Sequence, residues 1–276
     1  MPPTGIAAGV FSALSFGAGD FAGAFAARRA GAIIVVAGAH FVGLVALLVG
    51  VLIVRPPVPD VGPALIGVTA GVAGAVGLAA LYRGMSLGSM GIVTSLSGAG
   101  SLAIPLVAGT VLGASVTPVQ LAGVGCAAAA AMAASGASRD EVGRRALLLA
   151  GAAAIGFGTW YVLLDLAARG GDPLWALTFS RATSATLAAA FAFGRFDRAS
   201  FPVGIVIAAG LFDVGGNALY VVAREVIPIG LAAALTGLYP IVTMILARVV
   251  LGERLTRLGQ VGVAFALLGI VLISVG

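Results

Sequence analysis

The chain has 276 residues, of which 61% are hydrophobic and only 9% are charged, and its mean hydropathy is +1.16. This balance excludes an ordinary soluble domain and indicates a membrane protein throughout. The formal net charge is +5, but the basic residues are all arginines that gather mostly in short gaps between apolar runs, which indicates membrane topology and excludes nucleic-acid binding.

Disulfide and metal chemistry are excluded by the residue types present. Cys126 is the only cysteine and His40 the only histidine, so the chain can form neither an internal disulfide nor a thiolate or histidine-cluster metal site, and we expect no cofactor. Residues 1–19 lack the Lys or Arg of a secretory signal, and their pattern recurs from residue 151. We therefore interpret them as part of a retained membrane span.

Ten segments are long and apolar enough to cross the ~30 Å hydrocarbon core, which takes about 20 residues per helix. In chain order they are 5–26, 31–54, 63–82, 89–111, 118–136, 146–167, 173–193, 203–223, 228–250 and 257–275. The gaps hold only a few residues each and leave no room for a soluble domain. The sequence therefore predicts an all-α integral membrane protein with ten transmembrane helices.

The two halves of the chain resemble each other at a near-constant offset. The matching pairs are Phe16-Gly17 with Phe157-Gly158, Ala80-Leu81-Tyr82 with Ala218-Leu219-Tyr220, SLSG at 95–98 with ALTG at 234–237, and LGASVTPVQLAG at 112–123 with LGERLTRLGQVG at 251–262. Each unit has an odd number of spans, so the second must enter the membrane from the opposite side. We predict two inverted five-helix repeats, residues 1–138 and 139–276.

These features resemble the drug/metabolite transporter superfamily, EamA type. The resemblance rests on the duplicated five-span units, the Phe-Gly and Tyr matches, and the LGERLT that ends the ninth span, followed by Gln260 and Gly262. It implies a secondary transporter of small organic metabolites or drugs, frequently an exporter, with a cavity between the two halves. The chain departs from the family pattern at LGAS (112–115), where an acidic residue is usual.

Arginine counts predict how the chain is oriented in the membrane. The gaps after odd-numbered spans hold ten arginines, and those after even-numbered spans hold three. Because cytoplasmic loops are enriched in arginine, this count predicts that both termini lie outside the cytoplasm. The family resemblance implies the opposite, with both termini inside.

A few ionisable residues fall within the predicted spans, where each costs at least about 2.5 kcal/mol unless it has a partner or faces water. Asp213 and Arg181 lie near mid-depth in adjacent antiparallel spans, and we predict that they pair. The pair could simply tether two helices, or substrate and proton could compete for one partner. Asp213, Asn217 and Tyr220 share one face of span eight, which is either a binding stripe or a hydrogen-bonded seam between helices.

Two further polar residues are candidate coupling groups. His40 lies in span two and aligns with Arg181 in span seven; it either takes up a proton or bonds to the backbone. Asp20 is either a proton-carrying carboxylate that exchanges with substrate or a rim partner of Arg28. Asp165 is expected to form an interfacial ion pair with Arg169.

Aromatic and proline residues complete the candidate site. Trp160 and Tyr161 could wall the cavity or serve only in packing, and Tyr82 is a candidate binding residue as the counterpart of Tyr220. Pro105 and Pro240 are predicted to lie inside spans four and nine and to permit bending, with rigid kinks as the alternative. Glu253 and Arg254 are expected to form an exposed surface pair at the end of span nine.

The leading hypothesis is a proton-coupled secondary transporter, an exporter of a small organic metabolite or drug, in the cytoplasmic (inner) membrane of a bacterial-type cell. The chain has no nucleotide-binding GxxxxGK[ST] loop. The alternatives are an importer of a small polar solute such as a sugar or amino acid, an intramembrane enzyme, and a channel. Expected partners are a small-molecule substrate, protons or another coupling ion, and the lipid bilayer, and a homodimer is left open.

Overall fold

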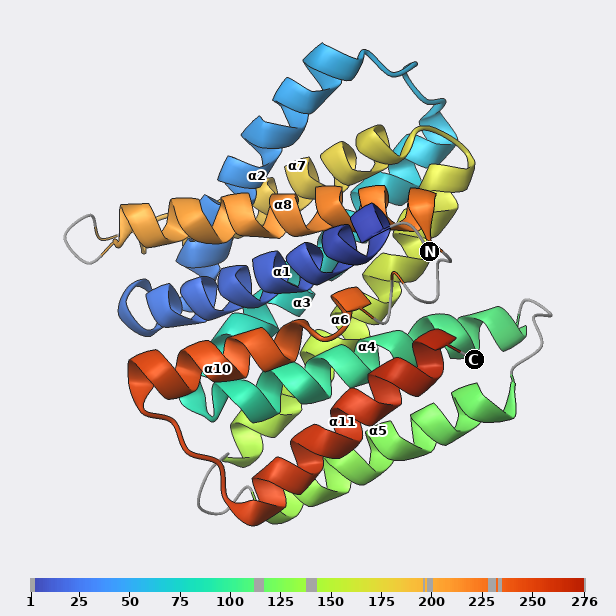
Figure 1. Ribbon diagram of the computed structural model, residues 1–276. Helices are drawn as coiled ribbons and strands as arrows, with labels where there is room; N and C mark the ends of the chain where they lie inside the picture. Colours follow the sequence, from blue (N-terminus) through green and yellow to red (C-terminus); the bar gives the residue numbers. More distant parts are fainter. Residues whose placement is uncertain are drawn as a thin grey trace.

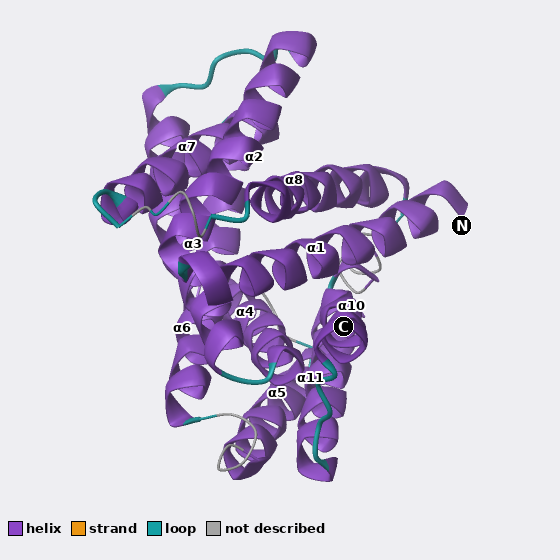
Figure 2. Cartoon of the chain, turned by 90° about the vertical axis from the view of Figure 1, so that its left-hand side faces the viewer, coloured by secondary structure: helices purple, strands orange, loops and turns teal. Residues whose placement is uncertain are grey.

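A computed structural model of the protein describes residues 3–111, 117–137, 143–195, 197, 201–227, 232 and 235–275. All regular secondary structure in these residues is helical (Figures 1 and 2). The helices are α1 (Pro3–Ala30), α2 (Ala32–Val54), α3 (Val61–Leu87), α4 (Met90–Val111), α5 (Pro118–Ala137), α6 (Arg144–Arg169), α7 (Pro173–Ala192), α8 (Val203–Val226), α10 (Tyr239–Leu251) and α11 (Arg257–Val275). The all-α fold predicted from the sequence is confirmed.

Helix positions follow the predicted spans closely, with one exception. Among the described residues, α1, α2, α3, α6, α8 and α11 are long and apolar enough to cross a membrane, and α4 and α10 contain shorter apolar stretches. The exception is the ninth span, predicted at 228–250, because α10 begins only at Tyr239 and residues 228–231 and 233–234 lie outside the described part of the chain.

Proline behaves differently in the two helices that were predicted to bend. Pro105 lies inside α4, as predicted. Pro240 does not lie in the interior of a helix. It occupies the first turn of α10, directly after a turn at Gly237 and Leu238. The prediction of a mid-helix proline in the ninth span was therefore wrong. A proline in the first turn sacrifices no helical hydrogen bond, so it marks the start of α10 instead of a kink.

Helix packing follows a pairwise pattern between the two halves. The most extensive contacts join α3 with α6, α1 with α8, α5 with α11, and α2 with α7. By helix order, α1–α8 and α6–α3 are equivalent pairs, and so are α1–α10 and α6–α4. An inverted duplication would produce this arrangement. The predicted boundary between residues 138 and 139 lies outside the described residues, so the two-repeat division stays a prediction.

Glycine allows the closest of these helix contacts. A Cβ atom on Gly156 of α6 would lie 2.6 Å from the Cα of Gly77 in α3, and one on Gly17 of α1 would lie 2.6 Å from the main-chain oxygen of Tyr239 in α10. Small residues let helix backbones meet in this way inside a membrane. The glycine of the repeated Phe-Gly pair therefore serves in helix packing. In the second copy, a Cβ on Gly158 would likewise crowd Ile104 of α4.

The largest hydrophobic cluster fills one end of the bundle. It is built from the last turns of α1, α3, α7 and α10 and the first turns of α2, α4, α6 and α8, with members such as Ala26, Tyr82, Met90 and Ala247. These helix ends adjoin the arginine-rich gaps. In Figure 1 the α10–α11 connection lies on the side of the molecule opposite the two termini, which lie together.

Glu253 connects the two halves at this same end, contrary to the prediction of an exposed surface pair with Arg254. Its carboxylate accepts hydrogen bonds from the Ser89 hydroxyl, from the Met90 N–H (3.1 Å) and from the Gly91 N–H (3.3 Å). It therefore caps the first turn of α4, where backbone N–H groups have no helical partner. No sequence pattern indicated this contact, because the two segments are more than 160 residues apart.

Candidate functional site

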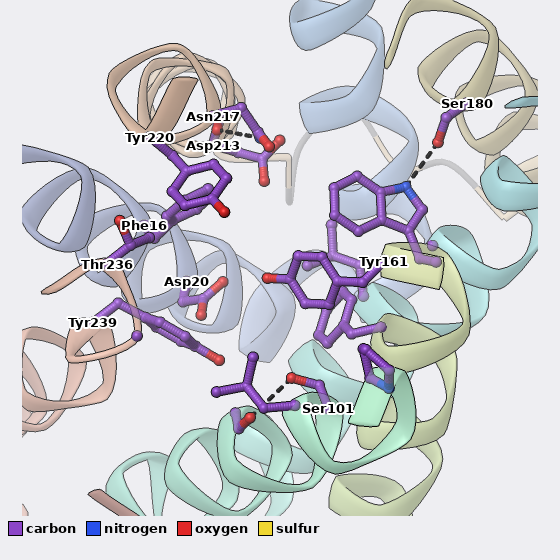
Figure 3. Close-up of a pocket in the computed structure, with 18 of the residues that line it drawn as sticks. Phe16, Asp20, Ser101, Tyr161, Ser180, Asp213, Asn217, Tyr220, Thr236 and Tyr239 are labelled. Carbon is purple, nitrogen blue, oxygen red and sulfur yellow. Dashed lines mark hydrogen bonds between the residues drawn. The ribbon is translucent and has the colours of Figure 1, made fainter. Parts of the chain in front are cut away.

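A cavity of about 310 Å³ lies in the middle of the bundle, between the two halves of the chain (Figure 3). Helices α1–α4 of the first half and α6–α8, α10 and α11 of the second all contribute to its wall. Its lining combines aromatic rings with a few polar groups: Phe16, Asp20, His40, Ser101, Pro105, Phe157, Trp160, Tyr161, Ser180, Arg181, Ser184, Asp213, Asn217, Tyr220, Thr236 and Tyr239, with small and aliphatic residues between them. Leu78 of α3 belongs both to this lining and to the hydrophobic cluster at the arginine-rich end.

The predicted ion pair between α7 and α8 is present at the cavity wall. Arg181 Nη2 lies 2.5 Å from Asp213 Oδ2, with the two side chains 8% and 24% exposed. The distance alone establishes the contact as an ion pair, so each group neutralises the other in a site that is largely removed from water.

The polar stripe predicted on α8 faces the cavity, but part of it is used internally. Figure 3 shows Asp213, Asn217 and Tyr220 on the cavity side of the helix. The Asn217 Nδ2 donates to the main-chain oxygen of Asp213 at 2.8 Å. One donor of the amide is thus spent within α8, and Asp213 is paired with Arg181. The stripe therefore offers less free hydrogen-bonding capacity than its residue types suggest.

Asp20 is the cavity carboxylate that has no cationic partner among the described residues. Its side chain projects from α1 into the cavity, near the hydroxyl ends of Tyr161 and Tyr239 (Figure 3). The alternative of a rim ion pair with Arg28 is not realised, since no ion pair joins Asp20 to Arg28 among the described residues. A lone carboxylate in such a site is costly unless a proton or another cation accompanies it.

His40 is buried and lines the same cavity from α2. The residue is only 4% exposed, and its Nδ1 atom has no hydrogen-bond partner among the described residues. The hydrogen bond to the backbone that was the alternative role for His40 is therefore not made by Nδ1 to any described residue. His40 and Arg181 both line the cavity, as their alignment between the halves suggested.

Trp160 and Tyr161 form an aromatic wall on α6. Their ring centroids are 5.0 Å apart at 65°, an edge-to-face arrangement. The Trp160 Nε1 donates to the Ser180 hydroxyl at 2.8 Å, which fixes the indole against α7. Gly74 of α3 makes room for the ring, since a Cβ there would lie 2.9 Å from Trp160 Cδ1.

Other predicted residues lie elsewhere. Tyr82 is 1% exposed in the hydrophobic cluster, where its ring fills the space that a side chain on Gly23 would occupy, and it does not line the cavity. Asp165 and Arg169 form the expected exposed ion pair at 2.8 Å. Of the two prolines, Pro105 lines the cavity and Pro240 is not among the lining residues.

Several cavity residues were not predicted. Phe16, Tyr239, Thr236, Ser180 and Phe157 all face the cavity. The repeated Phe-Gly contained a signal for the two phenylalanines, whose rings belong to the wall while their glycines pack against neighbouring helices. No sequence pattern distinguished Ser180 or Thr236 from the many small hydroxyl residues in apolar spans.

The sequence and the fold were compared with those of known proteins. The model of the EamA-like transporter family matches residues 144–275. One solved crystal structure of a protein is similar over 99% of this chain and 96% of its own, with a TM-score of 0.64 and 18% sequence identity, which shows a shared fold. No curated protein sequence matches the chain significantly.

The EamA match covers helices α6, α7, α8, α10 and α11 and the connections between them. Residues 144–275, slightly less than half of the chain, are therefore similar to the EamA-like transporter family, a family of membrane transporters.

Proposed function

We propose that the protein is a proton-coupled secondary transporter that exports a small organic metabolite or drug across the cytoplasmic membrane of a bacterial-type cell. The observation that supports this most strongly is the cavity to which both halves contribute and into which Asp20 projects without a cationic partner among the described residues. A site at the interface of two repeats is what alternating access requires, because rocking of the halves can then expose it to each side in turn.

Asp20 is the proposed coupling group. A carboxylate in this site is favourable with a bound proton or with a bound substrate, and the two exclude each other at one side chain. Protonation from outside would release the substrate, and loss of the proton inside would prepare the site for the next one. Asp213 is less suited to this exchange, because Arg181 already neutralises it.

Alternating access also needs one closed end at a time. The hydrophobic cluster and the Glu253 cap on α4 hold the helix ends together at the arginine-rich end, and we propose that this is the closed end in this conformation. If the arginine count gives the orientation correctly, the closed end faces the cytoplasm and the structure corresponds to a state that exchanges substrate with the outside.

The proposal is tested with purified protein in proteoliposomes. A thermal-shift panel of amino acids, sugars, nucleosides and organic ions selects solutes that raise the apparent stability of the folded protein. We expect saturable flux of a selected solute that responds to an imposed pH gradient and is lost in Asp20→Asn. Flux that ignores the gradient would refute proton coupling, and product formation without any gradient would refute transport in favour of an enzyme.

A further inference from the structure

The charges around the cavity indicate the class of substrate. Among its lining residues, two carboxylates (Asp20 and Asp213) face one guanidinium (Arg181), and with His40 neutral the wall carries a formal charge of −1 when Asp20 is ionised. A net charge in a small, largely apolar site demands a counter-charge. The counter-ion must come from the solute or from a proton, because no cation of the described chain pairs with Asp20.

An anionic substrate would find no free cation among the described residues that line this site. Arg181 is already 2.5 Å from Asp213. An anion that took over the guanidinium would leave the Asp213 carboxylate unpaired, and breaking a buried pair in this way is strongly unfavourable. His40 offers at most a hydrogen bond while it is neutral.

Aromatic rings surround the Asp20 carboxylate on several sides. Phe16 and Tyr239 lie 6.4 Å apart in an edge-to-face pair beside it, while Tyr161 and Tyr220 present their hydroxyl ends toward the same space (Figure 3). Ring faces attract cations, and the attraction is larger in sites removed from water. The cavity volume of about 310 Å³ is at the lower end of the range for small-molecule pockets, which limits the solute to a compact one.

From this arrangement we infer that the transported solute is a compact organic monocation, whose ammonium group meets Asp20 and whose apolar body packs against the aromatic wall. This inference rests on the proposed transport function and names its substrate class. Proton and cation then carry the same charge and replace one another at Asp20. The other groups that face this space are Asp213, Arg181, His40 and the tyrosine hydroxyls.

Trp160 provides a direct reporter of binding. The chain has two tryptophans, and Trp175 lies outside the cavity lining, where it stacks on Phe179 and donates to the Pro56 oxygen. A Trp175→Phe protein therefore reports from the cavity wall alone. Trp160→Phe, which keeps Trp175, is the matched control and should give no binding signal.

Three probes of similar shape separate charge from size: benzyltrimethylammonium, its neutral isostere neopentylbenzene, and benzylsulfonate. We expect saturable quenching by the cation, weaker binding of the other two, and a Kd for the cation that rises about tenfold or more in Asp20→Asn. Cation affinity should fall as the pH is lowered in the native protein and lose this pH dependence in Asp20→Asn. Asp20→Glu should restore binding, which keeps the test decisive if Asp20→Asn does not fold.

Equal or tighter binding of benzylsulfonate would overturn the inference, as would a folded Asp20→Asn protein with unchanged cation affinity. Counterflow in proteoliposomes separates this failure from failure of the proposed function. Gradient-driven flux of a neutral or anionic solute would leave the transporter in place and refute the cationic class. Saturable cation binding without any flux would uphold the class of ligand and refute transport.

Discussion

Removing the Glu253 carboxylate should weaken the contact between the α10–α11 connection and α4. The first three N–H groups of α4 are accounted for by two side chains: Met90 and Gly91 donate to Glu253, and Ile92 donates to the Ser89 hydroxyl at 3.4 Å. Gly252 ends α10 in the left-handed region with φ of 68°, and this turn directs Glu253 toward α4. The cap is therefore formed by the Leu-Gly-Glu sequence as a unit.

The magnitude follows from the groups that lose their partner. Loss of a capping side chain costs about 0.5–2 kcal/mol, and loss of a negative charge at a helix N-terminus costs about a further 0.3–1 kcal/mol. Glu253 is only half-buried, so water can reach part of the vacated site. We expect Glu253→Ala to lower the free energy of unfolding by about 1–3 kcal/mol in total.

Thermal unfolding in detergent measures this effect, with Arg254→Ala as the control because Arg254 is the exposed neighbour. Surface changes of that kind are usually within about 0.5 kcal/mol of the native protein. A double-mutant cycle of Glu253→Gln with Ser89→Ala should show a coupling energy of about 0.5–3 kcal/mol, since the two groups share a hydrogen bond. Equal stabilities of the Glu253 and Arg254 variants, or additive effects in the cycle, would refute the reasoning.

The remaining predictions concern packing, charge and orientation. Gly156→Ala should lower the free energy of unfolding by about 1–3 kcal/mol, because the added Cβ would meet the α3 backbone. Gly151→Ala on the same helix should leave the stability unchanged or raise it, because nothing lies within 4 Å of that position. Similar unfolding midpoints for the two variants would contradict this. Arg181→Gln and Asp213→Asn should each abolish transport while the protein remains in the membrane. The double variant should be more stable than either single variant, because neither charge is then left unpaired. Near-normal flux in both single variants would reject a role for the pair. A reporter active only in the cytoplasm should be silent at the C-terminus, and its activity there would reverse the orientation predicted from arginine.

Helix positions were largely predictable, and the ninth span shows the limit. Apolar runs between charged gaps locate helices because an unpaired backbone group in hydrocarbon is too costly for any other structure. Hydropathy cannot locate a break inside an apolar run, however. Residues 228–250 contain no charge before Arg248, so no charged residue marks the start of α10 at Tyr239. The sequence signal for this start is Pro240, a residue typical of the first turn of a helix.

The candidate site was predictable in its ionisable residues and less so in its wall. Asp20, His40, Arg181 and Asp213 stand out in a sequence because charge is rare inside a membrane, and all four line the cavity. Tyr82 shows why type and repeat position are not enough: it matches Tyr220 in sequence, yet it fills a notch over Gly23 in the hydrophobic cluster. Whether such a tyrosine lines the cavity or packs in the hydrophobic cluster depends on which neighbouring helix its side of the helix contacts.

The sequence alone determined that this chain is a membrane protein of ten mostly apolar segments, because solvation by lipid acts on each segment separately. The tertiary structure decided which polar groups are spent and which remain available. It paired Asp213 with Arg181, left Asp20 without a cation among the described residues, and brought Glu253 to the first turn of α4. These outcomes depend on contacts between helices distant in the chain, where small residues set how closely two backbones approach and which side chains then meet.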